Sequence, residues 1–245
     1  MPMSGHEAME HSQCAKDHTD TYLWKCPDGY GSYYSECIVL PEDLESSFYE
    51  DFRRSMERDC LRVVNGFNPN PYIYVENDKY VRFFAQAIDN CTQGLDAVQK
   101  ATAYLWFVNS CISYTSDTEL YGCDDYVAFP LETLYLRSGD CEDKSILLCA
   151  LLNAAGYDTV LVDFIGHMSC AVRLGGMGEG LNNYALSDGS YYYCEASSNV
   201  LKEIGGTPIT KDEPRIWKQD SNSILDSVQS LLASYRNLIW RTVRV

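Results

Sequence analysis

The sequence predicts an α+β fold in which a central helix packs on an antiparallel sheet and further helices come first. Apolar residues recur mainly at helical spacing as far as residue 155, whereas beyond residue 156 they recur at every second position, as in half-buried strands. The chain has 245 residues, of which 46 % are hydrophobic. This length and composition suffice to bury a substantial core in one or two domains.

The first 40 residues lack a regular pattern. Residues 1–20 are polar and are expected to form a flexible, solvated tail, but a soft-metal carrier remains an alternative for this segment. Its possible ligands are His6, His11, His18 and Cys14. Residues 21–40 hold tyrosine, glycine and two cysteines without a clear period, so loop-rich packing is expected there.

Three helices are predicted ahead of the part of the chain that could carry chemistry. The first runs from Pro41 to Cys60, where apolar residues recur every four positions and acidic residues occupy the first turn. Two further helical patterns follow at 78–91 and 95–113, separated by Gly94.

A fourth helix and a run of strands follow. Asp140 fits the N-cap position of a helix that ends at Gly156, and this places Cys141 at the helix N-terminus. Alternating apolar residues then predict consecutive antiparallel strands at 160–165, 168–174 and 191–195. The predicted organisation is a tail (1–20), an N-terminal helical extension (21–74), a core domain (75–210) and a C-terminal helix packed on the core (211–245).

Charge and cysteine spacing exclude several functions. Lys and Arg number 19 against 35 Asp and Glu, and the resulting net charge of −16 opposes nucleic-acid binding. The closest cysteines, Cys141 and Cys149, are too far apart for a paired-thiol metal motif, so no metal or cofactor is predicted. Eleven cysteines fit either one working thiol with ten that pair outside the cell, or a reduced cytosolic chain.

Targeting signals are also missing from the sequence as given. The longest apolar run, Ile146 to Leu152, is far shorter than the roughly 20 residues that span a bilayer, and residues 1–7 do not resemble a secretion signal. We therefore expect no membrane span in this chain. The compartment stays open: cytoplasmic if the chain is full length, extracellular if a targeting segment was removed. The oligomeric state is not predicted.

One set of residues could perform nucleophilic catalysis. A thiol is activated by a helix N-terminus and by an imidazole, and Cys141 is expected to have the first by position. His167 is the only histidine after residue 18, so it would have to supply the second. Glu195 lies on the next predicted strand, where a hairpin could set it beside the imidazole. Asp188 competes for this role, but Asp188-Gly189 is also a strong turn signal.

The segments around these residues resemble the transglutaminase-like superfamily, especially its archaeal and bacterial members. The resemblance covers roughly residues 75–210. Its motifs are 129–134 (FPLETL), 139–143 (GDCED), 147–157 (LLCALLNAAGY), Gly166-His167 and 191–195 (YYYCE). It implies a papain-like α+β fold with Cys141 as nucleophile, His167 as general base and acid, and Glu195 as the acidic third member.

The resemblance implies cysteine-dependent acyl transfer on a peptide or protein substrate, with water or an amine as acceptor; hydrolysis is favoured because prokaryotic members are often hydrolytic. One position departs from the family, since Asn109 stands where relatives often carry glutamine. Asn109 and the rival indole of Trp106 are the candidate side chains for an oxyanion hole. The alternative function is a catalytically inactive, transglutaminase-like module that binds peptides.

Overall fold

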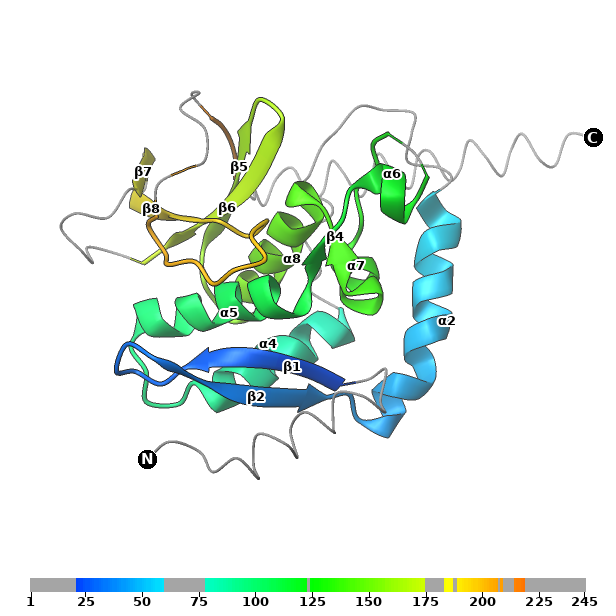
Figure 1. Ribbon diagram of the computed structural model, residues 1–245, viewed down its shortest axis with the longest axis horizontal. Helices are drawn as coiled ribbons and strands as arrows, with labels where there is room; N and C mark the ends of the chain where they lie inside the picture. Colours follow the sequence, from blue (N-terminus) through cyan, green and yellow to red (C-terminus); the bar gives the residue numbers. More distant parts are fainter. Residues whose placement is uncertain are drawn as a thin grey trace, which may run out of the picture.

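The computed structural model describes residues 21–59, 78–122, 124–174, 183–186, 189–206, 208 and 214–218, and the fold over these residues is α+β (Figure 1). Its helices are α2 (Glu42–Asp59), α4 (Lys79–Cys91), α5 (Ala97–Cys111), α6 (Asp117–Leu120), α7 (Pro130–Leu136) and α8 (Cys141–Ala154). Its strands are β1 (Thr21–Pro27), β2 (Tyr33–Val39), β3 (Ser113–Tyr114), β4 (Ser138–Gly139), β5 (Thr159–Phe164), β6 (His167–Arg173), β7 (Asn183–Leu186), β8 (Gly189–Cys194) and β9 (Arg215–Lys218).

The prediction of loop-rich packing for residues 21–40 is wrong, because these residues form an antiparallel hairpin of β1 and β2. The turn is built by Asp28, whose carboxylate accepts from two backbone N–H groups, and by Gly29, whose φ of +79° favours glycine. Tyr22 and Trp24 are buried and face α5. The partly buried Leu23 between them obscured the two-residue period in the sequence.

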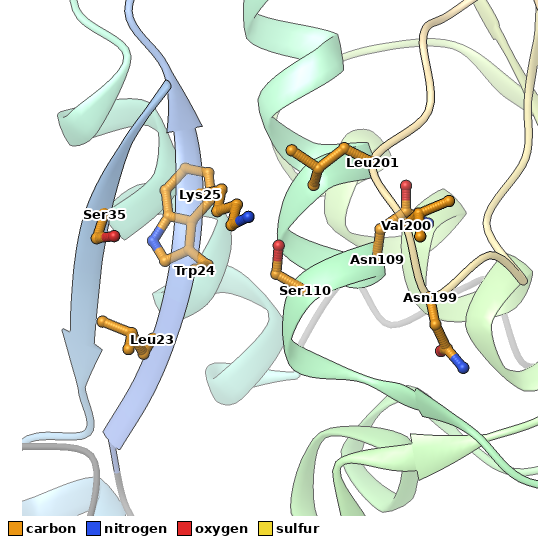
Figure 2. A pocket seen from close by; sticks show the side chains of 9 residues that line it. All are labelled: Leu23, Trp24, Lys25, Ser35, Asn109, Ser110, Asn199, Val200 and Leu201. Atoms are coloured by element: carbon orange, nitrogen blue, oxygen red, sulfur yellow. The ribbon is translucent and has the colours of Figure 1, made fainter. Parts of the chain in front are cut away.

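A cavity of about 380 Å³ lies between this hairpin and the rest of the molecule. Figure 2 shows that its lining comes from β1 and β2 on one side and from α5 and residues 199–201 on the other. Cys141, His167 and Glu195 are not among the residues that line it.

The three helices predicted for the first half of the chain are confirmed as α2, α4 and α5. The carboxylate of Asp78 caps α4 by accepting from the N–H groups of Tyr80 and Val81. Asp96 and Gln99 form a capping box at the start of α5, each side chain accepting from the backbone N–H of the other. These local hydrogen bonds explain why both boundaries agree with the sequence to within two residues.

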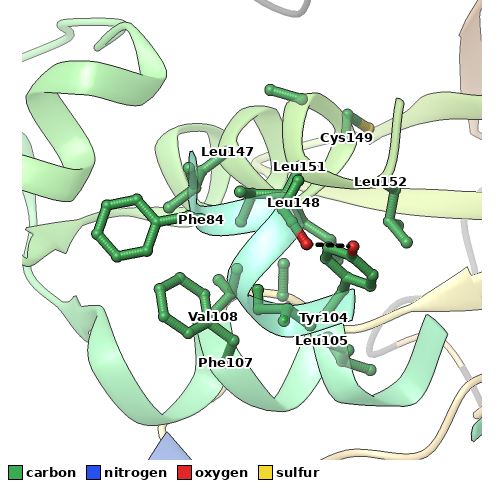
Figure 3. Close-up of a cluster of buried hydrophobic side chains, with 14 of the residues drawn as sticks. Phe84, Tyr104, Leu105, Phe107, Val108, Leu147, Leu148, Cys149, Leu151 and Leu152 are labelled. Atoms are coloured by element: carbon green, nitrogen blue, oxygen red, sulfur yellow. Dashed lines mark hydrogen bonds between the residues drawn. The ribbon is translucent and has the colours of Figure 1, made fainter. Parts of the chain in front are cut away.

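Helix α8 is the centre of the core. Every residue from Asp143 to Leu152 is buried, so this helix is enclosed on all sides, as its apolar sequence requires. Figure 3 shows α5 and α8 packing their side chains together, with Phe84 of α4 beside Phe107 of α5. The hydroxyl of Tyr104 donates within this cluster to the Ala85 carbonyl and the Asp89 carboxylate at 2.9 and 2.8 Å.

The main sheet is antiparallel throughout, as predicted, and its strand order is β7-β8-β6-β5-β9. Leu161 and Cys170 belong to the core cluster shared with the helices, whereas Val160 and Val162 belong to a second cluster on the other face. Strand β5 is therefore buried on both faces.

The structure describes only part of the two ends of the chain, so the predictions for residues 1–20 and 211–245 are tested only in part. Residues 1–20, with the possible soft-metal ligands, and the predicted helical face Ile224 to Leu238 lie outside the described residues. The segment predicted as a C-terminal helix, 211–245, includes strand β9 among its described residues. None of the described helices is both long enough and apolar enough to cross a bilayer.

Candidate active site

Cys141 is the first residue of α8, as the sequence predicts. The short parallel pairing of β3 with β4 carries the chain to this point, and Gly139 is required there because a Cβ atom would lie 2.6 Å from the Asp143 Cβ. Asp140 occupies the N-cap position, although its side chain makes no capping hydrogen bond. The thiol therefore sits at the positive end of the central helix dipole.

The surroundings of the Cys141 thiol oppose its ionisation in this conformation. Its Sγ donates to the Glu142 Oε2 at 3.0 Å. Burial, followed by the charge and hydrogen bond of Glu142, raises the pKa of Cys141 well above its usual value, whereas a hydrogen bond from the backbone of Met168 acts in the opposite direction. The thiol is therefore neutral at pH 7 in this arrangement.

His167 begins β6 and is paired with Glu195, which directly follows β8. The His167 Nε2 lies 3.3 Å from the Glu195 Oε2, and both side chains are largely buried. The pairing of β6 with β8 makes this contact possible, because Cys170 lies opposite Cys194 in the register. Since β7 lies between β6 and β8 in the chain, the expectation that one hairpin joins the two residues is wrong.

Three neighbours that the sequence did not single out hold Glu195 and His167. The Tyr193 hydroxyl donates to the Glu195 Oε2 at 2.5 Å and lies 3.4 Å from the His167 Nε2. The Glu195 Oε1 accepts from the hydroxyl and the N–H of Ser197 at 2.6 and 3.2 Å. Burial raises the pKa of Glu195, but the hydrogen bonds from His167, Ser197 and Tyr193 outweigh it, and the pKa lies below its usual value. Phe164 stacks on the imidazole, with ring centroids 6.2 Å apart.

The signal for Tyr193 was present in the sequence, because it precedes Glu195 by two positions and shares its face of the strand. The rival acid Asp188 lies outside the described residues.

The structure thus brings His167 and Glu195 into direct contact. One turn after Cys141 on α8, the Ser145 hydroxyl donates to the Met168 carbonyl at 3.1 Å, which fixes α8 against the start of β6. Among the described residues, the side-chain hydrogen bond of the thiol goes to Glu142 and not to the imidazole.

The two side chains predicted for an oxyanion hole have other partners. The Asn109 amide donates to the carbonyls of Glu195, Ala196 and Ser198 at 3.1 to 3.2 Å, and its Oδ1 accepts from the Lys202 N–H. The Trp106 Nε1 donates to the Lys202 carbonyl at 2.9 Å. Their contacts therefore do not support the oxyanion prediction, and both side chains instead hold the segment that follows β8.

Replacing Asn109 with alanine is expected to lower the free energy of unfolding by about 2 kcal/mol, because several buried carbonyls lose their donor. Denaturant unfolding measures this change. The matched control is Ser110→Ala at the exposed neighbouring position, for which we expect a change within about 0.5 kcal/mol. Equal stabilities of the two variants would contradict the anchoring role of Asn109.

A buried lysine three residues after Cys141 holds the same segment, and the sequence did not point to it. Lys144 is fully buried, and its Nζ donates to the Ile112 carbonyl at 2.6 Å, the Ser198 carbonyl at 3.2 Å and the Asn199 Oδ1 at 3.4 Å. Burial lowers the pKa of Lys144 to about 8, and the negative charge of Glu195 partly offsets this effect.

Several carboxylates gather beside the start of α8. Oxygens of Asp117, Asp140 and Asp143 lie within 4.8 Å of one another, and each of these residues has a buried oxygen without a hydrogen-bond partner. Burial raises the pKa of Asp117 to about 6 and, together with Glu142, that of Asp140 to about 8. Oxygen clusters of this kind are able to hold a cation.

Comparisons with known proteins agree with the motifs. The model of the Transglutaminase-like superfamily matches residues 82–167, from α4 to the first residue of β6. A solved structure described as "Crystal structure of a TGase" has 10 % sequence identity and a TM-score of 0.37, over 81 % of this chain and 49 % of that chain. This chain thus spans about half the length of that structure. No curated protein matches the chain. The family match includes both Cys141 and His167, so residues 82–167 are similar to a transglutaminase-like domain.

Proposed function

We propose that the chain catalyses cysteine-dependent acyl transfer on peptide or protein amide bonds, with Cys141 as nucleophile, His167 as general base and acid, and Glu195 as the orienting acid. The observation that carries this proposal is the buried His167–Glu195 pair at the start of β6, which the hydrogen bond from Ser145 to the Met168 carbonyl fixes against α8, the helix that begins at Cys141. A carboxylate that orients an imidazole, together with a thiol at a helix N-terminus, supplies the three groups that nucleophilic acyl transfer uses.

The reaction proceeds in two stages. His167 takes the proton of Cys141, and the thiolate attacks the carbonyl carbon of the substrate amide; the imidazolium then protonates the leaving amine as the C–N bond breaks. The product of this stage is a thioester on Cys141. Water or a second amine then attacks the thioester, with His167 accepting its proton, and the thiol is regenerated. Water gives a protease or amidase, and an amine gives a cross-linking enzyme.

The two nitrogen atoms of the His167 imidazole have different roles in this proposal. Because the Nε2 atom lies against Glu195, the Nδ1 atom is the one left to exchange a proton with the thiol. Glu195 stabilises the imidazolium that forms, and its lowered pKa keeps it charged. The Cys141 N–H at the start of α8 is available as an oxyanion donor. The thiol must leave Glu142 before it can transfer its proton to the imidazole.

The contact with Glu142 favours one second function. A thiol whose pKa is raised by burial and by a neighbouring carboxylate is a poor nucleophile. A catalytically inactive module that binds peptides would retain this arrangement permanently, whereas an enzyme must leave it during each turnover.

Thiol labelling separates the two functions. If His167 activates the Cys141 thiol once it has left Glu142, iodoacetamide at pH 7.5 modifies Cys141 faster than the half-buried Cys37 and Cys91, and mass mapping after digestion identifies each site. Glu142→Gln is expected to raise the Cys141 rate several-fold, because the variant removes a negative charge beside the sulfur. His167→Ala is expected to lower it about tenfold or more.

The matched control for these variants is Asp163→Asn, which removes a carboxylate from β5 and should leave the Cys141 rate unchanged. If Cys141 reacts no faster than Cys37, and neither Glu142→Gln nor His167→Ala changes its rate, the inactive module is the better description.

A further inference from the structure

Two buried thiols lie against each other where the central helix meets the sheet. Cys149 belongs to α8 and Cys170 to β6, and their sulfur atoms are 3.1 Å apart. Both side chains are fully buried. Figure 3 shows Cys149 on the side of α8 that is turned away from Tyr104 and Phe107 of α5.

The contact is a hydrogen bond that the Cys149 thiol donates to the Cys170 Sγ. The Cys149 Sγ has a weak interaction with the Val160 carbonyl at 3.7 Å, and a third buried thiol, Cys194, lies opposite Cys170 in the strand register. The Cys194 Sγ is 3.4 Å from the Tyr192 carbonyl. A free cysteine also packs in a core as a small apolar residue. What sulfur adds is the ability to form a covalent bond, and the observed separation exceeds the length of a disulfide by only about 1 Å.

We propose that Cys149 and Cys170 are a redox-active pair that forms a disulfide between α8 and β6 under oxidising conditions. With a hydroperoxide as oxidant, one thiol becomes a sulfenic acid with release of water. The second thiol then displaces hydroxide from that sulfur, so that the S–S bond forms and a second water leaves. Two thiols and one hydrogen peroxide thus give one disulfide and two waters.

The position of the pair gives the bond a structural consequence. Cys149 lies two turns after Cys141 on α8, and Cys170 lies three residues after His167 on β6. The bond would therefore join the two elements that carry the proposed nucleophile and the proposed base. It would close a loop between residues 21 positions apart, which lowers the entropy of the unfolded chain.

The environment also sets the rate at which the bond forms and breaks. Burial and the neighbouring thiols raise the pKa of Cys170, which disfavours its thiolate in the folded chain. We therefore expect oxidation of the folded chain to be slow, and the bond to resist reduction once it has formed.

Peptide mapping tests the pair directly. The full chain is incubated with hydrogen peroxide, unfolded in guanidinium with N-ethylmaleimide to block free thiols, digested without reductant and examined by mass spectrometry. The expected product is a cross-linked peptide that joins Cys149 to Cys170 and disappears on reduction. The melting temperature of the oxidised chain should exceed that of the reduced chain by roughly 5–10 °C.

Cys194→Ala is the matched control, because it removes a third buried thiol adjacent to the pair. This variant should keep the cross-linked peptide and the thermal shift, whereas Cys170→Ala should lose both. Recovery of Cys149 and Cys170 as separately alkylated peptides after oxidation would overturn the proposal, and so would a link from either residue to Cys194. The result on the unsubstituted chain decides the matter even if Cys170→Ala does not fold.

Discussion

A Cys141→Ala chain is expected to retain its fold and to lose the proposed acyl-transfer activity by about 10³-fold or more, because no thioester can form. His167→Ala is expected to cause a loss of similar size, since both residues act in the same step of the proposed reaction and their effects are not additive. Glu195→Gln keeps the shape of the side chain but removes the charge that stabilises the imidazolium, and we expect a smaller loss.

The assay measures two products from one peptide or protein substrate: hydrolysed amide, and conjugate formed with a labelled primary amine. Hydrolysis without conjugate would identify water as the acceptor. Cys37→Ala, which removes a half-buried cysteine from β2, is the control and should remain fully active. Activity that survives unchanged in Cys141→Ala would contradict the assignment of the nucleophile.

Replacing Lys144 with methionine is expected to lower the free energy of unfolding by about 2–4 kcal/mol. The change removes the donor from three acceptors, and this cost exceeds the gain from no longer burying an ammonium group. Lys202→Met, at an exposed position of the segment that Lys144 holds, is the control and should change stability by less than about 0.5 kcal/mol. Denaturant unfolding at pH 7 measures both variants.

The difference in stability between the original chain and Lys144→Met depends on pH. The pKa of Lys144 is about 8 in the folded chain against a usual value of 10.5, so between these pH values the unfolded chain binds more protons than the folded one. Stability contributed by this group therefore rises with pH in that window. The stability of the original chain minus that of Lys144→Met should increase by about 1 kcal/mol from pH 8 to pH 9. A difference that stays constant or falls would contradict the lowered pKa.

The elements that the sequence predicted well are those specified by neighbouring residues. The capping carboxylates Asp78 and Asp96 are close in sequence to the N–H groups that they bind. Helix α8 is recognisable in the sequence from its continuous apolar run, which the fold buries completely. The β1–β2 hairpin was missed because its inward-facing residues are recognisable only once α5 is known to cover them.

The same distinction between local signals and distant contacts applies to the candidate site. The position of Cys141 on its helix follows from local signals, and the closeness of His167 and Glu195 follows from strands that alternate regularly. The partners of Asn109 could not be predicted, because its amide binds carbonyls 86 to 89 positions away. The hydrogen bond from Cys141 to Glu142 depends on side-chain rotation, which spacing along the chain does not determine.

The order of strands in the main sheet bears on where the chain can be cut for laboratory work. The family match stops at His167, the first residue of β6, and a fragment with these boundaries would omit nearly all of β6 together with β7, β8 and β9. Strand β5, apolar on both faces, would then present two unsatisfied edges to solvent and would promote aggregation. The smallest expression unit that preserves the described fold extends from the hairpin at Thr21 to the end of β9 at Lys218.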